Sequence, residues 1–176
     1  MDEQWHLPDG TPVCIRAIRA DDLSMHADFV HGLSFQTGYS RLLSPRMPQD
    51  EELRRMTDVD SRRELALVTT TSVEGRDQEM GVARYIRGAT PETADIAEFA
   101  EFAIVIADAW QRRGLAMHLL ERLIDAARQA GVKQLSDITL YDNRGMLALA
   151  RKLGFKATRE AGDSNVTRLR LALFTQ

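Results

Sequence analysis

The hexapeptide QRRGLA, residues Gln111–Ala116, decides how this chain is interpreted. It follows the apolar run Phe99–Ile106 and precedes an amphipathic sequence that continues to Arg128. This order predicts a buried strand, a tight polar turn and a helix. The first backbone N–H groups of a helix have no partner inside it, and the helix dipole favours negative charge there. The segment therefore predicts a site for anionic phosphate oxygens.

Length and composition predict a single globular domain, with a core at about residues 13–174. The chain has 176 residues, of which 44% are apolar and 28% charged, which suffices for a hydrophobic core without disulfides. The apolar runs are too short to cross a membrane. Acidic residues, Asp2 and Glu3, stand where a secretory signal carries basic ones. We therefore expect a cytoplasmic protein that does not act at membranes.

Charge and residue spacing argue against several kinds of partner. A net charge of −3 argues against binding to nucleic acid. The single cysteine, Cys14, and the four histidines lack the spacing of metal ligands, so no metal site is expected. The sequence leaves open whether the chain forms a homodimer.

Hydrophobic periodicity predicts a mixed α/β (α+β) sheet with the order β-α-α-β-β-β-α-β-α-β-β. Strands are expected at Val13–Ile18, Glu64–Val73, Gly81–Ile86, Phe99–Ile106, Lys133–Leu140, from Phe155 onward and at Val166–Phe174. Helices are expected at Leu23–Leu33 with a short one from Ser34 toward Arg41, at Asp50–Met56, from Leu115 to Gly131 and at Asn143–Leu153. The strands from Glu64 to Ile106 form an antiparallel meander, and residues 89–95 form a polar loop.

These features resemble the GNAT superfamily of acyl-CoA-dependent N-acetyltransferases. The family signature is a strand followed by [Q/R]-x-x-G-x-[G/A] and a long helix, which Ile104–Ile106 and Gln111–Ala116 match. The resemblance covers nearly the whole chain and implies the GNAT fold, a mostly antiparallel sheet flanked by helices. It is closest to the acetyltransferase domain of bacterial protein lysine acetyltransferases, through Leu42, Asp58–Asp60, Arg63–Val68, Gly81–Tyr85 and Ala100–Asp108.

The resemblance implies that acetyl-CoA is the acyl donor and assigns residues to it. The backbone of Ile104, Val105 and Ile106 is expected to pair with the pantetheine amides. The pyrophosphate is expected to rest on Gln111, Arg112, Arg113, Gly114, Leu115 and Ala116. Glycine at position 114 also allows close approach to the backbone. Asn143 matches a family position that contacts the cofactor, although its residue type equally favours a helix N-cap.

Glu101 is the candidate catalytic residue. An alkylamine is almost fully protonated at pH 7, so direct attack on a thioester requires a general base. Glu101 lies among Phe99, Phe102 and Ala103, so we expect it to be partly buried with a raised pKa. It also matches the catalytic glutamate of the lysine acetyltransferases, and Glu98 is the reserve candidate on the opposite face of the strand.

The general acid of many GNAT enzymes has no counterpart here. Ala150 occupies the position of the tyrosine that protonates the leaving thiolate, which leaves Tyr141 or solvent for that role. The sequence thus predicts acetyl transfer from acetyl-CoA to a primary amine, with a protein lysine favoured. A small-molecule amine acetyltransferase and a non-catalytic acyl-CoA-binding regulatory domain are the alternatives.

Overall fold

A computed structural model describes residues 2–42, 46–88, 98–160 and 162–174, and the predicted polar loop at residues 89–95 lies outside them. Within these residues the strands are β1 (Glu3–His6), β2 (Pro12–Ala17), β3 (Glu64–Val73), β4 (Arg76–Arg87), β5 (Phe99–Ile106), β6 (Gln134–Leu140), β7 (Lys156–Glu160) and β8 (Asp163–Ala172). The α-helices are α1 (Leu23–His31), α2 (Phe35–Leu42), α3 (Asp50–Thr57), α4 (Leu115–Gln129) and α5 (Arg144–Lys152). Short 3₁₀ turns lie at Ala20–Asp22 and Asp108–Trp110.

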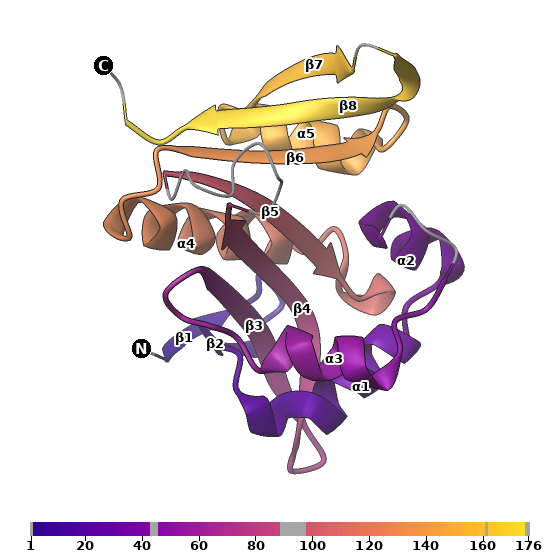
Figure 1. Ribbon diagram of the computed structural model, residues 1–176. Helices are drawn as coiled ribbons and strands as arrows, with labels where there is room; N and C mark the ends of the chain where they lie inside the picture. The colour runs from indigo at the N-terminus through magenta and orange to yellow at the C-terminus, as the bar shows by residue number, and fades with distance from the viewer. Residues whose placement is uncertain (1, 43–45, 89–97, 161, 175–176) are drawn as a thin grey trace.

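The strands of the described residues form one sheet in the order β1-β2-β3-β4-β5-β6-β8-β7. Neighbouring strands are antiparallel except β5 and β6, which are parallel. The predicted fold class, a mixed and mostly antiparallel sheet with flanking helices, is confirmed (Figure 1). The structure adds β1 and separates the early helical block into three helices, where the predicted order counted two.

Helices cover both faces of the sheet. The predicted apolar stripe of α4 is buried on one face, and Leu119, Leu120 and Leu123 are fully inaccessible there. On the other face, α1 and α3 bury Phe29 and Leu53 against β3, β4 and β5. None of the helices in the described residues is long and apolar enough to span a bilayer.

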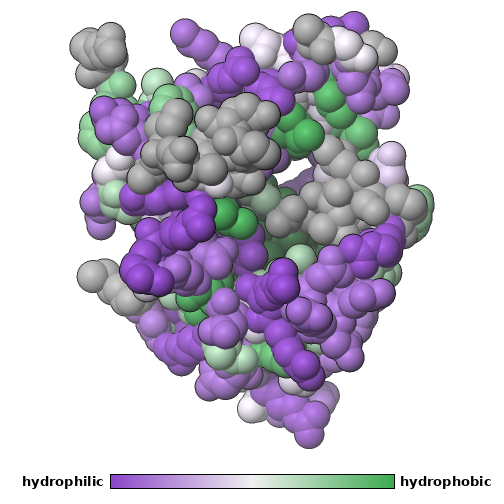
Figure 2. All heavy atoms as spheres, viewed as in Figure 1, coloured by the Kyte–Doolittle hydropathy of each residue, from purple (hydrophilic) through white to green (hydrophobic). Residues whose placement is uncertain are grey.

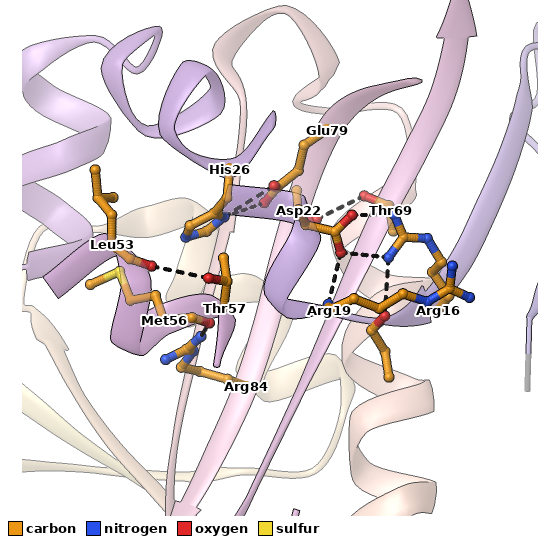
Figure 3. Close-up of polar contacts among 12 residues, drawn as sticks. Arg16, Arg19, Asp22, His26, Leu53, Met56, Thr57, Thr69, Glu79 and Arg84 are labelled. Atoms are coloured by element: carbon orange, nitrogen blue, oxygen red, sulfur yellow. Dashed lines mark hydrogen bonds and ion pairs between the residues drawn. The ribbon is translucent and has the colours of Figure 1, made fainter. Parts of the chain in front are cut away.

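A buried ion pair fixes the start of α1 against β2. Arg16 donates two hydrogen bonds, of 2.6 and 2.7 Å, to the two carboxylate oxygens of Asp22 (Figure 3). Asp22 also accepts a 2.8 Å bond from the backbone N–H of Arg19. The two hydrogen bonds between these charged groups offset the free-energy cost of removing both groups from water. The sequence predicted the acidic helix start but not its partner.

The parallel pairing of β5 with β6 is short. Register pairs join Phe99–Glu101 to Gln134–Ser136, and beyond them the two strands separate. The edge of β5 that faces β6 is therefore unpaired from Phe102 to Ile106 within the described residues. Unpaired strand edges expose backbone N–H and C=O groups that need partners.

The sequence pattern did not predict strand β1, because this strand is short and mostly polar. Its four residues alternate between half-buried and exposed positions. Trp5 lies with its ring 4.3 Å from that of His118 on α4, and Glu3 contacts the same histidine at 3.1 Å. These contacts hold an edge strand whose own sequence has low strand propensity.

We expect Gly81→Ala to destabilise the contact between β4 and β5. A Cβ atom at Gly81 would lie 2.5 Å from Cδ1 of Ile106 and 3.0 Å from the carbonyl oxygen of Val105. Overpacking of this kind costs about 1–3 kcal/mol of unfolding free energy, measured by urea denaturation.

The matched control is Gly38→Ala on α2, where an added Cβ meets no atom of the described structure within 4 Å. A helical alanine there should be neutral or stabilising by roughly 0.5–1 kcal/mol, and equal midpoints for the two variants would contradict the expectation.

Candidate active site

The separation of β5 from β6 opens a cleft of about 730 Å³. Its walls are the end of β5, the turn before α4, residues 137–139 of β6, α5 and α2. Figure 2 shows the surface hollowed between α2 and the β6–β8 part of the sheet, with apolar residues inside the hollow. A cleft of this volume can hold most of an extended small molecule.

One wall of the cleft is the free edge of β5. Ala103, Ile104, Val105 and Ile106 all line it, so the three predicted pantetheine-binding residues lie together. Because β6 has separated, backbone groups of this edge are available to an extended ligand that carries amide groups, apart from the Ile106 carbonyl, which accepts a bond from Gln111. Such pairing adds a strand-like segment to the sheet.

The predicted phosphate turn lies across the same end of β5. Gly114 has a φ of +86° and caps α4, while Arg112 takes the left-handed conformation with a φ of +60°. The first backbone bond of the helix runs from the N–H of His118 to Gly114. Within the described residues, the N–H groups between Arg112 and Met117 therefore make no backbone hydrogen bond to an acceptor in the turn or helix. Arg112, Gly114 and Ala116 line the cleft, which gives it a row of donors for an anion.

Side chains fasten this turn and α2 to the end of β5. The amide of Gln111 donates to the carbonyl of Ile106 at 3.0 Å and to the hydroxyl of Thr37 at 3.3 Å. Asp108 accepts bonds of 2.9 and 2.8 Å from the N–H and hydroxyl of Ser34 and one of 2.8 Å from Thr37. Burial acts to raise the pKa of Asp108, but these hydrogen bonds outweigh it and lower the pKa. No local sequence pattern predicts this contact, since α2 and Asp108 lie far apart along the chain.

Two of the predicted cofactor residues point away from the cleft. Arg113 makes a 3.0 Å ion pair with Asp9, and its guanidinium lies 4.9 Å from the ring centre of Trp110. Leu115 is buried in the core. Neither residue is in the cleft lining, and their role in binding the pyrophosphate stays a prediction.

Asn143 serves as an N-cap at the cleft. Its Oδ1 accepts a 3.1 Å bond from the N–H of Met146, and its Nδ2 donates to Thr139 at 3.2 Å. The side chain also lines the cleft. Of the two predicted roles, the cap is observed and the cofactor contact stays a prediction.

Glu101 stands where the cleft begins. It is half-buried and forms with Ser136 the last register pair between β5 and β6. Its neighbour Phe102 enters the core beside α4, so Glu101 faces the opposite side of the sheet. The pKa of Arg168 on β8 is raised mainly by its hydrogen bond to Glu160, with a smaller electrostatic contribution from Glu101. Glu101 does not line the cleft, and on β5 it lies two residues before Ala103, which does.

The reserve candidates for acid and base lie elsewhere. Glu98 is not on a strand face as expected but in the turn before β5, where its carboxylate forms a 2.8 Å ion pair with Lys133. Tyr141 is half exposed and does not line the cleft. Ala150 is buried in the core and offers no proton.

The fold and this cleft define an acetyltransferase of the GNAT class. The sequence model of the family described as "Acetyltransferase (GNAT) domain" matches residues 13–156, so the chain belongs to that family. Its members are acyl-CoA-dependent N-acetyltransferases. This membership assigns the enzyme class and identifies acetyl-CoA as the acyl donor.

Individual relatives are similar over most of the chain. Acetyltransferase PA5475 of Pseudomonas aeruginosa is 33% identical over 168 residues, which are 95% of this chain and 87% of that protein. Acetyltransferase Pat of Mycolicibacterium smegmatis is 30% identical over 127 residues, which are 72% of this chain but 36% of Pat. The crystal structure of the GNAT domain of S. lividans PAT superposes with a TM-score of 0.85 at 27% identity, covering 97% of this chain and 96% of that domain.

Proposed function

We propose that this chain transfers the acetyl group of acetyl-CoA to a primary amine, with a protein lysine as acceptor and Glu101 as general base. The observation that carries the proposal is the position of Glu101. Glu101 is half-buried at the last β5–β6 register pair, two residues before the free strand edge that lines the cleft and on the strand that leads to the row of N–H donors. A non-catalytic acyl-CoA sensor would not need a carboxylate at that place.

The geometry suggests how the donor lies. The pyrophosphate would rest on the N–H groups of Gln111–Ala116 with Arg112 supplying positive charge. The pantetheine arm would then run along Ile104–Ile106 toward Ala103. Glu101 is two residues farther on the same face of β5, about 7 Å along the strand. The thioester would thus reach the end of the cleft near this carboxylate.

Glu101 would take the ammonium proton directly or through one water. The free amine then attacks the thioester carbonyl, the nitrogen loses its second proton to solvent, and the carbon–sulfur bond breaks as the thiolate leaves. Because Ala150 provides no acid, solvent would protonate the thiolate. Tyr141 does not line the cleft, which disfavours it for this step.

A polypeptide acceptor is favoured by the surface beside the cleft. On α2, Phe35 is 73% exposed and Tyr39 is 37% exposed, and their ring centres are 6.0 Å apart. The neighbouring face of the helix, at Gln36, Thr37 and Ser40, lines the cleft. Exposed aromatic residues of this kind are typical of protein contact surfaces. The resemblance to bacterial protein lysine acetyltransferases supports the same acceptor, and a small-molecule amine is the second candidate.

Glu101→Gln tests the base. We expect kcat to fall about 100- to 10,000-fold because a positioned general base contributes an effect of that size. The Kd for CoA should stay near the wild-type value, since the carboxylate does not line the cofactor cleft. Thiol release from acetyl-CoA with a lysine peptide measures the rate, and calorimetry measures binding.

Glu98→Gln is the matched control, because it removes a carboxylate from the turn before the same strand and should retain activity. Unchanged turnover in Glu101→Gln would disprove the base assignment. Binding of acetyl-CoA by wild type without thiol release for any lysine peptide or small amine would favour the regulatory alternative.

Gly114→Ala tests the phosphate turn. The left-handed conformation costs a non-glycine residue roughly 1–2 kcal/mol, so the turn should shift and CoA affinity should fall about tenfold. Gly131→Ala is the control, because Gly131 has a similar φ of +79° at the other end of α4. Both variants should lose stability to a similar extent, whereas equal CoA affinity in the two would remove the turn from the cofactor site.

Phe35→Ser distinguishes the two kinds of acceptor. If a protein surface docks on α2, the KM for a folded protein substrate should rise several-fold while the KM for a short alkylamine stays constant. Steady-state kinetics with both acceptors provides the measurement. An equal change for the two acceptors would remove α2 from acceptor recognition.

A further inference from the structure

A second, smaller cavity lies on the face of the sheet covered by α1 and α3. Its volume is about 40 Å³, and its walls are mostly apolar, formed by residues such as Phe29, Val30, Leu33, Met56 and Val82. Val105 of β5 borders both this cavity and the acetyl-CoA cleft, and α2 also contributes to both. The cavity is thus adjacent to the strand edge along which the pantetheine arm would lie.

Arg84 is one of two charged or titratable groups in the described lining of this cavity. It is half-buried on β4, and its guanidinium donates a hydrogen bond to the backbone carbonyl of Met56 (Figure 3). Among the described residues no carboxylate lies within ion-pair distance of it. Burial lowers the pKa of Arg84, with Glu64 and Glu79 opposing that effect from a distance. A fixed cation with remaining N–H donors and no counter-ion is suited to an anionic ligand.

His26 of α1 is the other such group. Its Nδ1 lies 3.0 Å from both carboxylate oxygens of Glu79, and both side chains are at least 97% buried. Burial raises the pKa of Glu79, although the hydrogen bond from His26 opposes this. Figure 3 shows that the opposite edge of the imidazole points away from Glu79, and Nε2 has no hydrogen-bond partner within the described residues. Glu79 therefore orients the ring, and when its carboxyl group is protonated it donates to Nδ1, which leaves Nε2 as the N–H donor of the imidazole.

We propose that this cavity is a carboxylate-binding subsite for the acceptor, in which Arg84 and His26 bind the anionic group of the molecule whose amine is acetylated. This inference rests on the proposed function. A buried water requires about 10–15 Å³, so a 40 Å³ cavity holds roughly three heavy atoms, the number in a carboxylate group. The guanidinium of Arg84 and the Nε2–H of His26 supply donors for the two oxygens of such a group.

The strand register relates the subsite to the base. Arg84 pairs with Ala103 across β4 and β5, and Glu101 is two residues away on the same face. An amine at Glu101 and a carboxylate at Arg84 would therefore be separated by several ångströms. Free lysine and a polypeptide with Asp or Glu close to the target lysine both provide this arrangement.

The test compares acceptors that differ only in the carboxylate. Lysine is paired with cadaverine, and a lysine peptide with a neighbouring Glu is paired with the same peptide carrying Gln. Wild type should prefer the carboxylate member of at least one pair by about tenfold in kcat/KM, mainly through KM. The pair that shows the preference identifies the source of the carboxylate. In Arg84→Met the preference should disappear, and in His26→Gln it should fall by several-fold.

Arg55→Met is the matched control, since Arg55 is exposed on α3 next to Met56 and should leave the preference intact. Urea unfolding of each variant checks that it folds. A wild type without preference in either pair, or an Arg84→Met variant that keeps it, would overturn the subsite.

A binding measurement separates this inference from the proposed function. Glutarate has carboxylates but no amine, so it should bind CoA-loaded wild type by calorimetry and bind Arg84→Met at least about tenfold more weakly. If no amine is acetylated but glutarate binds in this way, the proposed function fails and the subsite stands. Equal glutarate binding by wild type and Arg84→Met would exclude the subsite whatever the activity.

Discussion

The separation of β5 from β6 is the constraint on which the rest of the site depends. Two parallel strands that remained paired would use the amides of Ile104–Ile106 within the sheet and leave no cleft. Because the pairing ends at Glu101 and Ser136, β5 carries both the free backbone edge that we expect to bind the donor and the candidate base Glu101 next to the start of that edge. The early end of the β5–β6 pairing thus places the backbone groups expected to bind the donor and the candidate general base a few residues apart on β5.

The walls of the cleft are held by polar contacts that cross between distant segments. Asp108 and Gln111 connect the end of β5 to Ser34 and Thr37, so α2 is tied to the turn that begins α4. These contacts are partly exposed, and each contributes modestly to the free energy of folding. Because α2 borders both the cleft and the small cavity, these contacts also hold the two sites in fixed positions relative to each other.

Local pattern made part of this structure predictable. The apolar stripe of α4 and the QRRGLA turn specify their own conformations; the fold class predicted from periodicity and the enzyme class implied by the family resemblance are confirmed. The side-chain direction of Arg113 depends on Asp9, which lies about a hundred residues earlier, so no local pattern could give it. The buried pair of His26 and Glu79 was missed for the same reason, because its two members become neighbours only when α1 packs on β4. Glu101 as base stays a prediction.

The short parallel ladder also has a consequence for the order of folding. The β3–β4 hairpin brings together residues that are near in sequence, whereas the ladder joins Phe99 to Gln134 across the whole of α4. Contacts between distant residues carry a larger loop-closure entropy and form later on average. The nascent chain would therefore complete its meander first and acquire the cleft only when β6 and α5 dock beside β5, so a chain that ends before α5 has no complete cleft.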